Sequence, residues 1–183
     1  EFAAFRKESG LDYYISGNHF LQPSEGEILD IKDLSLLAGP EREKALKNHF
    51  AAICRAIESG VFAFIAHVDY IRKSEFCPDE AFWQEKMKVV DCLEKCKTAT
   101  ELSSKGLRKR GDFYPADKLI REIVRRQIPL VVSDDAHRTG ELGFEFAKSE
   151  EYLRKLDCRR RWQFYFFAVF VRIFTVQTGF TRS

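Results

Sequence analysis

Short apolar runs alternate with longer amphipathic segments over residues 11–164. The runs have the length of strands, and the longer segments repeat their apolar residues every three or four positions, as helices that cover a sheet do. Because strands separated by helices usually pair in parallel, the alternation predicts an α/β fold with a parallel sheet. The expected strands are residues 13–16, 61–66, 98–103 and 129–133, and the expected helices are residues 40–59, 79–97, 115–127 and 141–156.

The ends of these elements carry the usual signals. Pro40 lies in the first turn of the first long helix, and Gly60 follows its end. The run 61–66 is almost continuously apolar, which is typical of a strand buried on both faces.

Three of the four histidines follow predicted strands. His19 follows the first strand, His67 the second, and Asp135 with His137 the last. Ligands of α/β sheets collect beyond the carboxyl ends of the strands, and imidazole with carboxylate suits zinc, manganese or iron. A lone histidine there is more often structural, but four such side chains at corresponding ends favour a metal cluster. His49 lies in the middle of a helix and is expected to be a packing or surface residue.

Two basic groups lie slightly beyond these strand ends. Arg72 follows His67 by five positions, and Arg108 follows the strand that ends near residue 103. Arginine binds phosphate in a bidentate way, so both are candidates to hold a phosphoryl group. The alternative is that both are solvated loop charges.

Composition limits the class of protein. The 183 residues are 45% hydrophobic and 32% charged, as in soluble globular domains, and the net charge of +2 gives little support to a nucleic-acid partner.

The five cysteines form no CxxC pair, which indicates free thiols in a reducing compartment, and no secretory signal is visible. A cytoplasmic location is therefore expected. Cys92 and Cys96 lie one helical turn apart and are expected to pack in the core.

The last part of the chain differs in kind. Residues 162–174 are dense in aromatic side chains but shorter than the roughly 20 residues of a spanning helix, and they contain Arg172. No membrane association is expected. We expect residues 165–183 to form a separate aromatic-rich tail.

Four ordered blocks resemble one known family. The blocks DYYISGNHFL (12–21), AHVDYIRK (66–73), ELSSKGLRK (101–109, followed by Tyr114 and Pro115) and SDDAH (133–137) are similar to the blocks DYVIGSVHFL, GHLDxIRK, EINTSGLRK and SDAH of the PHP-domain histidinol phosphatases.

The resemblance implies a distorted (β/α)7 TIM-like barrel with up to three divalent metal ions at its mouth, of the zinc, manganese or iron type. It implies hydrolysis of L-histidinol phosphate to L-histidinol and phosphate, a step of histidine biosynthesis. The implied metal ligands are His19, His67, Asp135 and His137, of which Asp135 and His137 are also catalytic. Arg72 and Arg108 would hold the phosphate, and Asp69 and Glu101 would be supporting or substrate-side groups.

The chain also departs from the family. The H-x-H strand and the further ligands that precede the first block in the family are not present, so we expect residues 1–164 to be an N-terminally truncated PHP domain that lacks its first strands and has impaired activity. Ser103 replaces an asparagine. Two alternatives remain open, namely another PHP phosphoesterase and a non-catalytic binding module.

Overall fold

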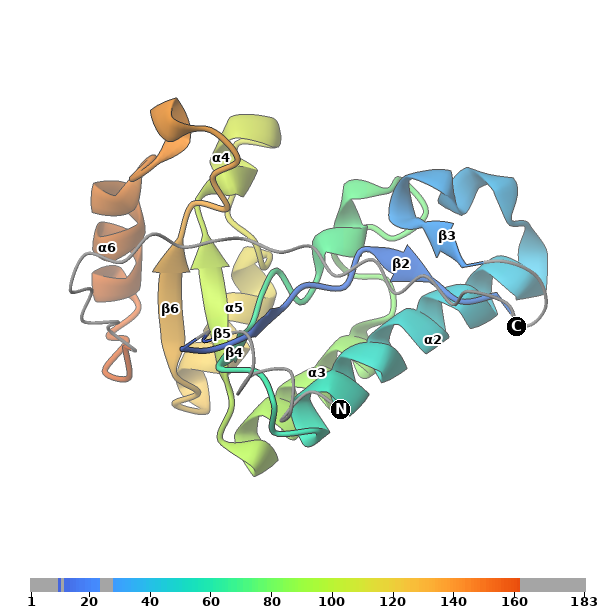
Figure 1. Cartoon of the computed structure of the whole chain (residues 1–183), viewed down its shortest axis with the longest axis horizontal. Coiled ribbons are helices and arrows are strands. Elements are labelled where there is room, and N and C mark those ends of the chain that lie inside the picture. The colour runs from blue at the N-terminus through green and yellow to red at the C-terminus, as the bar shows by residue number, and fades with distance from the viewer. Residues whose placement is uncertain (1–9, 11, 24–27, 162–183) are drawn as a thin grey trace.

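The computed structural model describes Gly10 and residues 12–23 and 28–161 (Figure 1). The predicted domain limit at residue 164 and the aromatic tail 165–183 lie outside these residues.

A parallel sheet forms the centre of the fold. Its four strands are β1 (Ile15–Ser16), β4 (Phe64–Ile65), β5 (Ala99–Ser103) and β6 (Leu130–Ser133), in the spatial order β1-β4-β5-β6. Each neighbouring pair is parallel, and Ser103 pairs with Ser133 at the carboxyl end of the longest ladder. The prediction of an α/β fold with a parallel sheet is confirmed. The described strands form an open sheet, and closure into a barrel stays a prediction.

Helices connect and cover these strands. They are α2 (Gly39–Glu58), α3 (Trp83–Cys96), α5 (Asp117–Arg125) and α6 (Phe146–Lys155), with the short α4 (Lys105–Lys109) directly after β5. The long helices α2 and α3 lie side by side, and α6 lies beside β6 (Figure 1). All four predicted helices exist, although three begin later than predicted, α5 by only two residues. Turns occupy residues 79–82, and the 3-10 helix η3 (Thr139–Glu141) and a turn precede α6.

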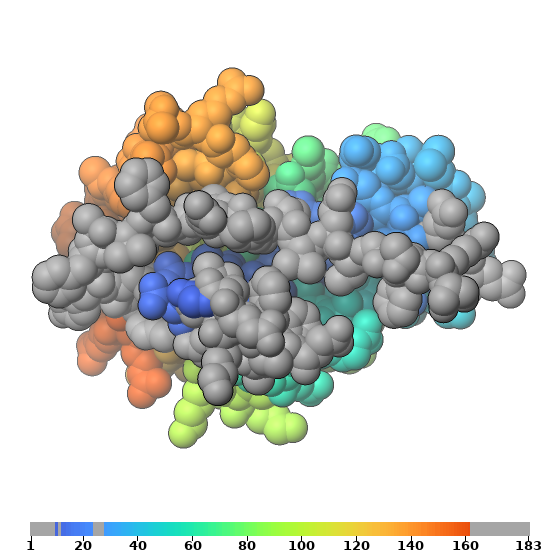
Figure 2. All heavy atoms as spheres, in the orientation of Figure 1, coloured from blue at the N-terminus to red at the C-terminus, as the bar shows by residue number. Residues whose placement is uncertain are grey.

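Two short strands interrupt the predicted pattern after β1. Strand β2 (Phe20–Leu21) pairs antiparallel with β3 (Leu29–Asp30), and the 3-10 helix η1 (Ile31–Leu36) follows. These strands are too short to produce a periodic signal. The region of β3 and η1 forms one end of the molecule, and the segment after β6 lies toward the other (Figure 2). His19 lies between β1 and β2, so its backbone is held from both sides.

The core lies between the sheet and the helices that cover it. Ile53 of α2, Leu93 of α3 and Ile120 of α5 are almost completely buried there. Cys92 packs against this core, but Cys96 is exposed, so the prediction that both are core residues is wrong for Cys96. Cys96 lies on the same face of α3 as Val89 and Leu93, but it is the last residue of the helix, beyond its buried residues. In the described ranges, no helix is long and apolar enough to cross a membrane.

Candidate functional site at the strand ends

The carboxyl ends of all four parallel strands carry polar side chains. The arrows of β5 and β6 point the same way, and α4 and the loop after β6 lie beyond their tips (Figure 1). His19 follows β1, His67 follows β4, Lys105 follows β5, and Asp135 and His137 follow β6. The predicted side chains therefore come to one edge of the sheet, together with a lysine that was not predicted.

Two imidazoles form one half of this edge. The rings of His19 and His67 meet edge to face with their centroids 4.7 Å apart. The Tyr70 ring lies against both, at 5.0 Å from His19 and 4.8 Å from His67. Gly17 leaves room for them, because a Cβ there would lie 3.0 Å from Nε2 of His67 and 3.5 Å from Nε2 of His19. Both Nε2 atoms therefore face the same small space.

The other half of the edge is an ion-paired group. Oδ1 of Asp135 lies 3.3 Å from Nε2 of His137. The ammonium of Lys105 donates a hydrogen bond to Oδ2 of Asp135 at 2.5 Å and lies 3.2 Å from Nε2 of His137. Lys105 and Asp135 are largely covered, with side chains 15% and 23% exposed, whereas the His137 side chain is 64% exposed. His137 is thus the member of the group that solvent and a ligand can reach.

The two halves act on each other electrostatically. Burial, and after it the nearby His19, lower the pKa of His67 to about 4, while the charge of Asp135 opposes the shift. Burial also lowers the pKa of His19, which feels Asp135, Lys105 and His137. Because desolvation disfavours the imidazolium, both rings are neutral near pH 7 and keep lone pairs available. Nδ1 of His67 is buried with no hydrogen-bond partner in the described structure.

Glu101 of β5 holds neighbouring strand ends in place. Its Oε1 accepts a hydrogen bond from the backbone N–H of His67 at 2.6 Å, and its Oε2 accepts one from the Ser133 hydroxyl at 2.5 Å. The side chain is buried, which raises its pKa to about 7. Glu101 therefore supports the site from beneath and has no exposed face for a substrate.

The backbone is strained at two of the predicted ligands. His67 has φ 29° and Asp135 has φ 47°, in the left-handed region that residues with a Cβ rarely adopt. Such conformations cost free energy and persist where the surrounding structure requires them, often at functional sites. Here the Glu101 hydrogen bond fixes the backbone at His67.

Arg108 reaches the loop that carries Asp135 and His137. Its Nη2 donates to the carbonyl of Asp134 at 2.9 Å, and its Nη1 lies 3.4 Å from Oε2 of Glu141, which also accepts from the His137 N–H. Its guanidinium lies 5.0 Å from the centre of the Phe144 ring. Nη1 is buried and has no hydrogen-bond partner in the described part of the chain. The structure thus brings Arg108 to the predicted edge, with Nη1 ion-paired to Glu141 but not hydrogen-bonded.

Arg72 has a different environment from the one predicted. Its side chain is fully buried, and its Nε donates to Asp79 at 2.6 Å, Nη1 to the Phe113 carbonyl at 3.0 Å, and Nη2 to Asp79 and Asp112. Although burial alone would lower it, these hydrogen bonds raise the pKa of Arg72. All of its nitrogens are engaged, so the structure does not bring Arg72 to the strand-end group as a free phosphate ligand. It joins the loop after β4 to the loop after α4.

Asp69 and His49 are also structural. Oδ2 of Asp69 accepts the N–H of Ala116 at 2.8 Å, and the carboxyl group is completely buried, which raises its pKa to about 6. His49 is buried in α2, as the sequence predicts, and its Nδ1 lies 3.1 Å from the Phe20 carbonyl and 3.0 Å from Nδ2 of Asn18. It thereby fixes both neighbours of His19.

The donor types suit a divalent metal, but their arrangement does not. Three imidazoles and a carboxylate are the right ligands for zinc, manganese or iron, and the space beside Gly17 receives two imidazole nitrogens. Lys105, however, already holds Asp135 and His137. Over the residues that the structure describes, no three His, Cys, Asp or Glu side chains converge as a metal ion requires. The four predicted ligands therefore do not fit a shared metal ion in this arrangement.

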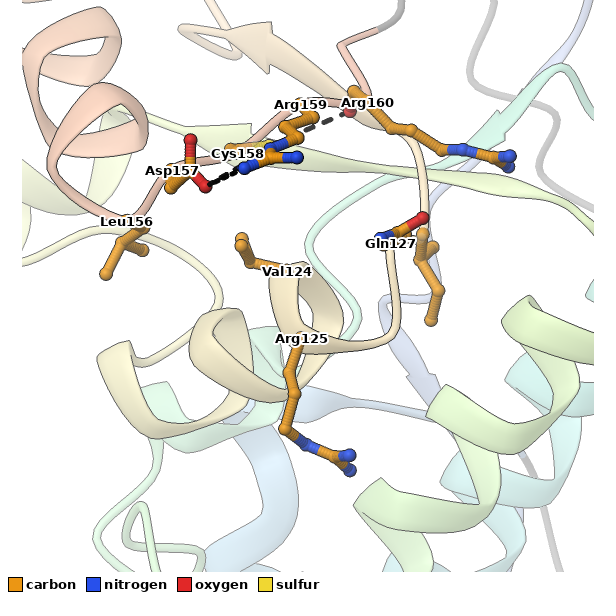
Figure 3. A pocket seen from close by; sticks show the side chains of 9 residues that line it. Val124, Arg125, Gln127, Leu156, Asp157, Cys158, Arg159 and Arg160 are labelled. Atoms are coloured by element: carbon orange, nitrogen blue, oxygen red, sulfur yellow. Dashed lines mark hydrogen bonds and ion pairs between the residues drawn. The ribbon is translucent and has the colours of Figure 1, made fainter.

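A separate hollow lies at the opposite end of β6. It has a volume of about 370 Å³ and lies between the end of α5 and the segment after α6 (Figure 3). Arg125, Asp157, Arg159 and Arg160 are among its lining residues, and Asp157 pairs with Arg159 across 2.9 Å. Gln127 and Ile128, which precede β6, also line it, whereas Asp135 follows that strand. This hollow is not part of the strand-end group.

Sequence reasoning missed Lys105, Tyr70 and Gly17. Lys105 stands where the resembling block EINTSGLRK has serine, and this difference was the one sign in the sequence that the position is unusual. Tyr70 and Gly17 act through ring packing and through the absence of a Cβ, which spacing alone does not reveal.

Comparisons with known proteins agree with these blocks. The chain is 31% identical over 115 residues to the "Probable histidinol-phosphatase" of Deinococcus radiodurans. The aligned region covers 62% of this chain and 43% of that protein. The chain thus spans less than half of that relative's length. No protein-family model matches the chain.

A solved structure shows the same fold. The crystal structure of the candidate histidinol phosphatase hisK of Listeria monocytogenes superposes with a TM-score of 0.59 at 17% identity, over 80% of this chain and 62% of that one. In sequence and in fold, the chain is therefore similar to PHP-type histidinol phosphatases over part of their length.

Proposed function

We propose that the strand-end group is the phosphate-handling part of a phosphomonoesterase of the histidinol-phosphatase type. The reaction would convert L-histidinol phosphate and water to L-histidinol and inorganic phosphate. The observation that carries the proposal is that His19, His67, Asp135 and His137 all lie at one sheet edge, in a chain that is 31% identical over 115 residues to a probable histidinol-phosphatase.

Positive charge at this edge supports an anionic substrate. Nη1 of Arg108 makes no hydrogen bond in the described structure, although it lies 3.4 Å from Glu141, and the Lys105 ammonium is bound to Asp135 at the same edge. Phosphate oxygens accept strong hydrogen bonds from both groups. We assign phosphate binding to Arg108 and leave Arg72 with the ion pairs that bury it.

Asp135 and His137 are the proposed proton-transfer pair. When the P–O bond to the alcohol breaks, the phosphoryl group passes to water, and the departing alkoxide needs a proton. His137 is exposed enough to reach that oxygen, and Oδ1 of Asp135 lies 3.3 Å from Nε2 of His137, where it orients the ring. General acid catalysis of this kind contributes about 10²–10⁴-fold to a rate.

The test is phosphate release from L-histidinol phosphate, measured with a chelator and with added Mn²⁺ or Zn²⁺. We expect His137→Gln to lower kcat/KM at least about 100-fold, and Lys109→Ser, at an exposed position on α4, to leave it unchanged. Absence of release above the buffer blank in all conditions, or equal rates for wild type and His137→Gln, would contradict the proposal. Release from another phosphomonoester alone would favour a different PHP phosphoesterase, and binding without release would favour a binding module.

A further inference from the structure

Lys105 contacts the Asp135–His137 half of the strand-end group and lies near the imidazole half. It begins α4 immediately after β5, so its side chain starts at the sheet edge. Its ammonium bonds to Asp135 at 2.5 Å, lies 3.2 Å from Nε2 of His137 and lies 5.9 Å from the centre of the Tyr70 ring, which packs on His19 and His67. The ammonium is thus a cation on two potential metal ligands, Asp135 and His137, close to the ring that packs on the other two.

The ammonium uses the same electron pairs that a metal ion would use. A lysine ammonium has three donors and no acceptor, so Asp135 and His137 can contact it only through their lone pairs. Those lone pairs are then occupied. Moreover, a divalent ion placed among these side chains would be repelled by the lysine charge in a covered position, where screening by solvent is weak.

Tight local contacts keep Lys105 in this position. Its side chain is 15% exposed, and its backbone lies between the buried residues Ser104 and Gly106. A Cβ on Gly106 would lie 2.2 Å from the Asp112 carbonyl oxygen, so α4 is packed too closely to shift easily. Moving the ammonium away would also leave the partly covered Asp135 without its closest cation.

We propose that Lys105 takes the place of a divalent metal ion in the strand-end group, so that the chain disfavours such an ion there until the lysine charge is removed. This inference rests on the geometry of the group and does not require phosphatase activity. Lys105 is in this sense a specificity-determining residue, which selects an internal cation over an external one.

The test is direct titration of Mn²⁺ into the 183-residue chain, followed by calorimetry and by the electron paramagnetic resonance of free Mn²⁺. Mn²⁺ is chosen because it prefers oxygen and nitrogen ligands to the five cysteine thiols. We expect Lys105→Ser and Lys105→Gln to bind one equivalent at least tenfold more tightly than wild type. Lys105→Arg, which keeps the charge, and Lys109→Ser, on the same helix but exposed, should bind as wild type does.

A double variant tests whether the additional Mn²⁺ ion binds at the strand-end group. Adding Asp135→Asn to Lys105→Gln should abolish the gain, while thermal unfolding checks that each variant is folded. Lys105→Gln keeps a long polar side chain, so it serves even if Lys105→Ser does not fold. Equal affinity of wild type and Lys105→Gln, or a gain that persists with Asp135→Asn, would overturn the proposal. Because no turnover is measured, failure here is distinct from failure of the phosphatase assay.

Discussion

The carboxylate of Glu101 accepts a hydrogen bond from the backbone N–H of His67 at 2.6 Å, from one strand to the end of its neighbour. The same carboxylate accepts from Ser133 on the other side. A side chain in β5 thus ties the ends of β4 and β6, which carry most of the candidate site. The precision of that site depends on a buried acid that itself has no access to a ligand.

Glu101→Gln should change how stability depends on pH. An unfolded glutamate titrates near 4.5, and burial raises the pKa of folded Glu101 to about 7. Between these values the folded state binds more protons than the unfolded state, so this contribution to the free energy of unfolding is present below pH 4.5 and is lost as the pH rises to 7. The full loss is on the order of 3 kcal/mol, from a pKa difference of about 2.5 at about 1.4 kcal/mol per unit.

Glutamine can keep both hydrogen bonds, because its oxygen accepts from His67 and its amide donates to Ser133. We therefore expect Glu101→Gln to gain stability relative to wild type at pH 8 compared with pH 5, measured by urea denaturation at both values. Glu58→Gln, at an exposed glutamate of α2, is the control. The same stability difference at the two pH values would count against this role of Glu101.

Arg72→Met should destabilise the fold strongly. Removing the guanidinium leaves Asp69 buried without its cation and deprives Asp79 and Asp112 of a partner. Breaking a buried pair in this way costs about 3–5 kcal/mol, discounted here because Asp79 and Asp112 are partly exposed. Arg121→Gln, which breaks an exposed pair with Asp117, should leave the stability nearly unchanged, because solvent screens such pairs. If both variants showed the same denaturation midpoint, Arg72 would have to be reconsidered as a ligand-binding residue.

Gly17→Ala should disturb the two imidazoles. The new Cβ would lie 2.9 Å from Cε1 of His67, closer than carbon atoms normally approach, and the His67 ring is held by Tyr70 and His19. Overpacking of this kind costs about 1–3 kcal/mol. Thermal unfolding and the imidazole NMR signals of His19 and His67 report the two effects. Gly140→Ala, at a position with open space around it, is the matched control, and an equal change in both variants would argue against a specific contact.

The secondary structure and the strand-end residues could be read from the sequence because each depends on local pattern. Buried strands such as β4 need continuous apolar residues. The carboxyl ends of parallel strands lie at the same edge of a sheet, so His19, His67 and His137, which follow such strands, are brought to that edge. The role of Arg72 could not be read, because it depends on Asp112, forty positions away, reaching the same guanidinium. The resembling block marks Lys105 as a change from serine, but only the folded chain shows that the lysine reaches Asp135.

The most direct measurement of the phosphate site is a titration of inorganic phosphate, the proposed product, into the protein, followed by the imidazole NMR signals of its four histidines. His137 is exposed beside Lys105 and Arg108, whereas His49 is buried in α2 against Phe20. Phosphate should therefore shift the signals of His137, and to a lesser degree those of His19 and His67, with a single saturating affinity that Arg108→Gln weakens, while His49 stays unchanged. Signals that do not move at saturating phosphate, or a shift of His49 as large as that of His137, would contradict a phosphate site at the strand ends.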